Sequence, residues 1–134
     1  MPPNDLGKLI EYWRDGALYD LENAQILARE KRLISSLFFL HLAVEKCLKA
    51  IYVQENQVHA PLMHNLTYLL GKTSLEVTKR DFLFLENLNE FNIRGRYPEE
   101  SYELQNQLTV TGCKQMVAQA KKFILWSLKK SKLR

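Results

Sequence analysis

Apolar residues recur at intervals of three and four along most of the chain, which is the spacing of one face of an α-helix. The first segment shows this spacing clearly, with apolar side chains at Leu6, Leu9, Ile10, Trp13, Ala17, Leu21, Ala24, Leu27 and Ala28. We therefore expect a long amphipathic helix over residues 5–30.

The next segment, residues 33–52, contains neither glycine nor proline, and its apolar residues point around much of the helix circumference. This pattern predicts a helix at the buried centre of a bundle. Pro61 then interrupts the pattern, because proline disfavours helical geometry at the residue before it and cannot donate a backbone hydrogen bond. We expect only a short helix after it, over about residues 64–72.

The second half of the chain predicts two more long helices. Thr78 and Asp81 resemble a capping box, so a helix should run from about 79 to 94. Residues 95–109 are polar, include Pro98 and follow neither period, so we expect an irregular, exposed segment that can carry function. A last helix should begin near Val110. Four long helices and one short one predict an all-α bundle.

Length and composition predict one domain, and the charge is distributed unevenly. The chain has 134 residues, of which 46% are apolar, so a single domain over residues 1–134 is expected. The net charge is +4, yet the stretch from Leu104 onward contains no acid and seven cations: Lys114, Lys121, Lys122, Lys129, Lys130, Lys132 and Arg134. Such a basic end can bind nucleic acid, or it can solubilise a terminal helix and complement its dipole.

Several classes of protein are excluded by absent patterns. No stretch approaches the roughly 18 apolar residues of a membrane span, and the start lacks a secretory leader, so we expect no membrane and a cytoplasmic location. Cys47 and Cys113 have neither a CxxC pattern nor a nearby histidine, which predicts buried, reduced thiols and no metal site. Phosphate-loop, dinucleotide, zincin and serine-hydrolase motifs are missing. We expect no cofactor.

Three motifs in order carry a family resemblance. Residues 43–50 read AVEKCLKA, residues 64–66 read HNL, and residues 94–98 read RGRYP. In this order and spacing they resemble the HEPN domain of prokaryotes across almost the whole chain. The resemblance implies an up-and-down four-helix bundle with an additional short helix. It also implies a homodimer, often encoded beside a minimal nucleotidyltransferase in a toxin–antitoxin-like module, with nucleotide or RNA as the ligand.

Catalytically active relatives carry an R-x4-6-H ribonuclease motif, which this chain lacks. The positions that could hold the histidine after Arg94 or Arg96 hold Glu99, Glu100, Ser101, Tyr102 and Glu103. These residues remove the imidazole that could act as a general acid or base, and carboxylates repel phosphate. We expect no ribonuclease activity of the known type.

The RGRYP motif provides the first candidate ligand-binding residues, Arg94, Arg96 and Tyr97. A guanidinium fork can grip phosphate and a tyrosine ring can stack on a base. The alternative is structural: the arginines cap carbonyls and pair with nearby glutamates, while Tyr97 packs the loop.

The other candidates are His64, Lys46 and Lys49. His64 could donate to a phosphate or satisfy the first turn of the short helix that follows it. His41, Glu45 and Lys49 form a polar stripe at intervals of four, which is either an internal ion pair or, with Lys46, the lining of an anion pocket or twofold interface.

These observations leave three functions open. The first is a non-catalytic nucleotide- or RNA-binding subunit with a nucleotidyltransferase partner. The second is a ribonuclease-like toxin with a rearranged site, in which His64 replaces the lost imidazole. The third is a structural dimerisation or adaptor domain.

Overall fold

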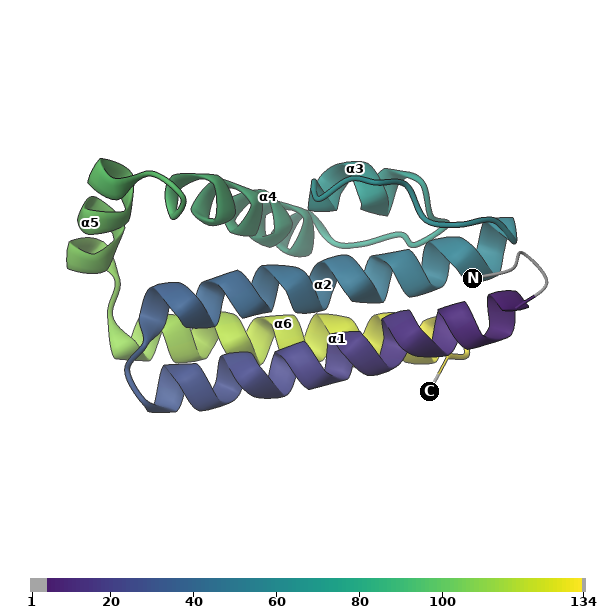
Figure 1. Cartoon of the computed structure of the whole chain (residues 1–134), viewed down its shortest axis with the longest axis horizontal. Coiled ribbons are helices and arrows are strands. Elements are labelled where there is room, and N and C mark those ends of the chain that lie inside the picture. Colours follow the sequence, from purple (N-terminus) through teal and green to yellow (C-terminus); the bar gives the residue numbers. More distant parts are fainter. Residues whose placement is uncertain (1–4, 134) are drawn as a thin grey trace.

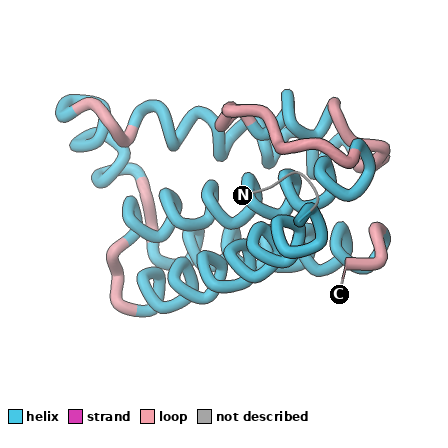
Figure 2. The backbone as a smooth tube through the Cα atoms, turned by 45° about the vertical axis from the view of Figure 1, so that its right-hand side comes forward, coloured by secondary structure: helices cyan, strands magenta, loops and turns pink. Residues whose placement is uncertain are grey.

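A computed structural model describes residues 5–133, and in this range the regular secondary structure is entirely helical (Figures 1 and 2). Arg134, counted above in the basic end, lies outside the described residues. The helices follow one another as α1 (Leu6–Arg29), α2 (Leu33–Asn56), α3 (Leu66–Gly71), α4 (Lys79–Arg94), α5 (Pro98–Gln107) and α6 (Val110–Lys130).

The long helices α1, α2, α4 and α6 run alternately up and down the bundle, and the short α3 lies beside the start of α4 (Figure 1). The predicted fold class, an all-α up-and-down bundle with an additional short helix, is confirmed. Within residues 5–133 no helix combines the length and apolar character needed to cross a membrane.

Helix α2 is the centre of the bundle, as its apolar circumference predicted. It packs on α1, α3, α4, α5 and α6, and residues on nearly every side of it are buried. Its fully buried side chains include Leu40, Val44, Leu48 and Ile51. Burying each such side chain stabilises the fold by about 1.5–3 kcal/mol, so these contacts fix the position of the polar residues that α2 also carries.

Side-chain caps set the starts of three helices. Asn65 Oδ1 accepts a hydrogen bond from the Tyr68 amide at α3, Thr78 Oγ1 accepts from Asp81 at α4, and Thr109 Oγ1 accepts from Gly112 at α6. The predicted bounds of α4, 79–94, agree with the structure.

The prediction of an irregular segment over residues 95–109 is wrong, because Pro98–Gln107 form α5. Pro98 stands in the first turn, where its missing amide costs nothing, and Glu99 and Glu100 complement the helix dipole there. Only Leu104 of this helix is buried, so no apolar period marks it in the sequence. A polar helix with one anchor therefore resembles a loop when read from periodicity alone.

Candidate functional site

The corner between α4 and α5 separates its two arginines into different roles. Arg94 donates from Nε to Glu100 Oε2 over 2.9 Å, and its other nitrogens lie 3.7 Å from Glu103 and 3.9 Å from Glu90. Three carboxylates thus surround this guanidinium, and two of them belong to α5. Arg94 ties α5 to the end of α4, which is the structural alternative considered above.

Arg96, in contrast, is exposed and has a neutral partner. Its guanidinium donates to Asn92 Oδ1 over 3.1 Å, and no ion pair involves it among the described residues. Tyr97 follows it as the residue before the first turn of α5, and 60% of its surface is exposed. The guanidinium of Arg96 and the ring of Tyr97 thus belong to consecutive residues of this corner, and both are exposed to solvent.

The polar stripe of α2 forms a buried charge cluster with His64. Glu45 Oε2 accepts from Lys49 Nζ over 3.0 Å and lies 3.0 Å from His64 Nδ1, which acts as the donor. The side chains of Glu45 and Lys49 are each only 6% exposed, while that of His64 is 69% exposed. His64 therefore lies at the exposed edge of the cluster, and its Nε2 atom has no hydrogen-bond partner among the described residues.

Two buried atoms of this cluster lack a hydrogen-bond partner. His41 Nδ1 and Glu45 Oε1 face each other across 3.7 Å, too far for a hydrogen bond, and neither has another partner within the described residues. Such atoms are costly in a protein interior and often mark a site that a ligand or water completes. The cluster thus has capacity for further hydrogen bonds beneath His64.

Asn89 of α4 joins the cluster to α3. Its Oδ1 accepts from the Leu66 amide over 2.9 Å and lies 3.4 Å from His41 Nε2, while its Nδ2 donates to Asn65 Oδ1 over 3.1 Å. Sequence reasoning missed this residue, because an asparagine in a polar helix carries no motif. The hydrogen bonds of Asn89 form because α3 and α4 pack on one another and on α2.

His41 connects the cluster electrostatically with the α4–α5 corner. Burial lowers the pKa of His41 below its ordinary value of 6.5, opposed by the Glu45 carboxylate and by the hydrogen bond to Asn89. His64 and Arg96 add to the lowering of this pKa, since both favour the neutral imidazole.

Lys46 and Lys49 both have partners within the protein, Lys49 buried and Lys46 partly exposed. Lys46 Nζ lies 2.8 Å from Asp20 Oδ2 of α1, and Lys49 Nζ lies 5.1 Å from the centre of the Trp13 ring in addition to its contact with Glu45. Lys46 packs against Gly16 of α1, where an added Cβ would meet its Cδ at 3.0 Å. The structure brings Lys49 and His64 together through Glu45 and places Lys46 at the α1–α2 contact.

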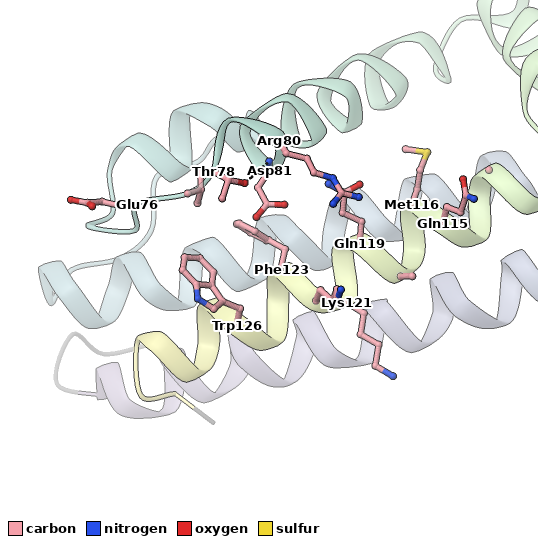
Figure 3. Close-up of a pocket in the computed structure, with 14 residues that line it drawn as sticks. Glu76, Thr78, Arg80, Asp81, Gln115, Met116, Gln119, Lys121, Phe123 and Trp126 are labelled. Atoms are coloured by element: carbon pink, nitrogen blue, oxygen red, sulfur yellow. Dashed lines mark hydrogen bonds between the residues drawn. The ribbon is translucent and has the colours of Figure 1, made fainter.

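A second feature, an open groove, lies between α4 and α6 and was not expected from the sequence (Figure 3). Its volume is about 1250 Å³, and its lining includes Arg80, Met116, Phe123 and Trp126. The one feature of this groove that the sequence indicated is the basic character of the last helix. No group of three or more potential metal ligands occurs among residues 5–133.

Comparisons with known proteins agree with this architecture. The family described as the HEPN domain matches residues 10–131. The crystal structure of TT1696 from Thermus thermophilus superposes with a TM-score of 0.76 at 20% sequence identity, covering 91% of this chain and 97% of that one. This likeness concerns the fold alone. No match was found among curated proteins.

Proposed function

Because this chain belongs to the HEPN domain family, we propose that it is a non-catalytic nucleotide- or RNA-binding subunit that works with a nucleotidyltransferase partner. In this proposal residues 1–134 form one HEPN-like domain, which assembles as a homodimer in the cytoplasm as part of a toxin–antitoxin-like module. The ligand contacts Arg96 and Tyr97 first, with His64 and the cluster around Glu45 beside them. Arg94 and Lys49 support the site from within the protein, and Lys46, also a candidate from the sequence, pairs with Asp20 at the α1–α2 contact.

The observation that carries the proposal is the contrast between the two arginines of the corner. Three carboxylates surround Arg94, whereas Arg96 is exposed, has a neutral hydrogen-bond partner and precedes an exposed tyrosine. A guanidinium without a carboxylate partner retains its donors for phosphate, and an adjacent ring can stack on a base. The positions where active relatives carry a histidine lie on α5 of this chain. Two of these positions hold Glu100 and Glu103, whose carboxylates lie close to Arg94. This arrangement supports binding without cleavage.

Thermal unfolding with a panel of nucleotides and a short RNA tests this proposal. A ligand present at about 100 times its dissociation constant adds roughly 2.7 kcal/mol, which raises Tm by several degrees for a domain of this size. We expect such a shift for the wild type and its loss in Arg96→Ala. Lys8→Ala is the matched control, because Lys8 is an exposed cation at the start of α1, at the opposite end of the bundle from α5 (Figure 1). No shift with any ligand would favour a structural adaptor instead.

The partner is tested separately by co-expression. A nucleotidyltransferase encoded next to this chain should elute with it on size exclusion, at a mass that contains two copies of this chain. Elution of the two proteins apart at micromolar concentration would contradict the partnership while leaving ligand binding unaffected.

A second candidate, a ribonuclease with a rearranged site, is favoured by the His64–Glu45 pair. A buried carboxylate that orients Nδ1 of a histidine whose Nε2 is free is an arrangement suited to general acid–base catalysis. In this case RNA cleavage by the purified protein should fall in both His64→Ala and Glu45→Gln. Cleavage that survives both substitutions would come from a contaminant.

A further inference from the structure

The groove between α4 and α6 is an unfilled edge of the bundle. Within the described residues α4 packs closely on α2, α3 and α5, and α6 packs on α1 and α2, but α4 and α6 do not pack closely on one another. In Figure 3 the start of α4 and the middle of α6 form its two walls, with Asp81 and Phe123 pointing toward each other across it. A bundle whose fourth edge is open can accept another helix there.

The floor of the groove is apolar and includes an exposed tryptophan. Val77 and Met116 are half-buried, Phe123 is buried, and Trp126 is 40% exposed beside Phe123. Tryptophan is among the residue types that contribute most to protein interfaces. These side chains come from both walls, so an apolar stripe lying between α4 and α6 would contact both.

The two walls differ in charge. The α6 wall contributes Lys122, which forms no ion pair in the described residues, whereas the side chain of Lys121 points away from α4 (Figure 3). No acid occurs from Leu104 to the end of the sequence. The opposite wall contributes Glu76 and Asp81 together with Arg80. An occupant must therefore present negative charge to α6 and tolerate carboxylates on the other side.

We propose that this groove binds an amphipathic helix of a partner protein, with apolar residues on one face and acidic residues along the flank that meets α6. The lining runs along α6 from Gly112 to Trp126, a rise of about 21 Å, which corresponds to about four helical turns. A helix can segregate its charges between its two flanks, whereas a nucleic-acid strand brings a phosphate with every nucleotide close to Glu76 and Asp81. Charge complementarity on one wall and carboxylates on the other therefore favour a helix.

A peptide of 16 residues tests this proposal. Leucines at positions i, i+3, i+4 and i+7 form its apolar stripe, and glutamates occupy one flank. A scrambled peptide of the same composition is the control for amphipathicity. We expect the amphipathic peptide to bind with a dissociation constant below about 100 μM, from its anisotropy and from a change in tryptophan fluorescence that is lost in Trp126→Ala, which retains Trp13. The scrambled peptide should bind at least about tenfold more weakly.

Variants locate the binding. Lys122→Glu and Trp126→Ala change exposed side chains, and each should weaken binding about tenfold or more, while Lys8→Glu and Arg96→Ala bind the peptide like the wild type. Because Arg96 belongs to the proposed nucleotide site, this result separates the groove from the function proposed above. Equal affinity for both peptides, or unchanged affinity in Lys122→Glu, would overturn the proposal. A 15-nucleotide oligothymidine that changes Trp126 fluorescence while the peptide does not would assign the groove to nucleic acid instead.

Discussion

The buried Glu45–Lys49 pair predicts a large and specific loss of stability when only one partner is removed. Their charged atoms lie 3.0 Å apart, and both side chains are 6% exposed, so solvent screens them little. In Lys49→Met the Glu45 carboxylate keeps its contact with the exposed His64, while Oε1 still lies 3.7 Å from His41 Nδ1 without a hydrogen bond. Breaking a buried pair in this way costs about 3–5 kcal/mol, whereas an exposed pair contributes about 0–1 kcal/mol.

Urea unfolding of four proteins measures this effect: the wild type, Lys49→Met, Glu45→Leu and the double variant. For a domain of this size, 3–5 kcal/mol corresponds to a fall in Tm of roughly 10–20 °C. The double variant removes both charges and should be more stable than either single variant, because no uncompensated charge remains in the interior. The m-value should stay constant, so that the midpoints report stability alone.

Two results would refute this reasoning. Single variants that lose less than about 1 kcal/mol would place the pair in a solvated environment. A double variant whose loss equals the sum of the two single losses would mean that the two side chains do not interact in the folded protein.

The buried groups and the α4–α5 corner give three more measurable outcomes. Burial lowers the pKa of His41 below 6.5, so the unfolded state binds this proton more readily than the folded state. The free energy of unfolding should therefore fall as the pH drops below about 6.5, and it should fall less in His41→Gln. Equal urea midpoints across about pH 5.5–7.5 for both proteins would contradict this. Burial raises the pKa of Cys47 to about 12 and also raises that of Cys113, so neither thiol should react with a thiol reagent at pH 8 until urea unfolds the protein. Arg94→Ala should cost about 1 kcal/mol or less and speed amide exchange in α5 while leaving that of α2 unchanged.

The helical architecture could be predicted from the sequence because it depends on local periodicity. The three-and-four spacing in residues 5–30 and the apolar circumference of residues 33–52 identify α1 and α2, and the Thr78 cap marks the start of α4. Periodicity did not predict helix α5, because one buried leucine cannot establish a helical repeat. Its position depends on ion pairs with Arg94, which join residues six and nine positions apart across a helix end.

The candidate site could be predicted only in part. The sequence predicted the polar stripe of α2. The internal ion pair between Glu45 and Lys49, which was one of its two interpretations, is present in the structure. The contact of His64 with Glu45 was not predictable, since it depends on how the segment after α2 folds back. The different surroundings of Arg94 and Arg96 depend on which of them faces α5. Their ligand-binding roles, with that of Tyr97, remain predictions.

Chemical-shift mapping of the ¹⁵N-labelled protein with the same nucleotides and RNA tests the central claim most directly. We predict that at least one ligand shifts the amide signals of Arg96 and Tyr97 and the side-chain signals of His41 and His64, with signals at the start of α1 unchanged. These shifts should disappear in Arg96→Ala. Shifts confined to other surfaces, or none with any ligand at millimolar concentration, would contradict a nucleotide- or RNA-binding site at the α4–α5 corner.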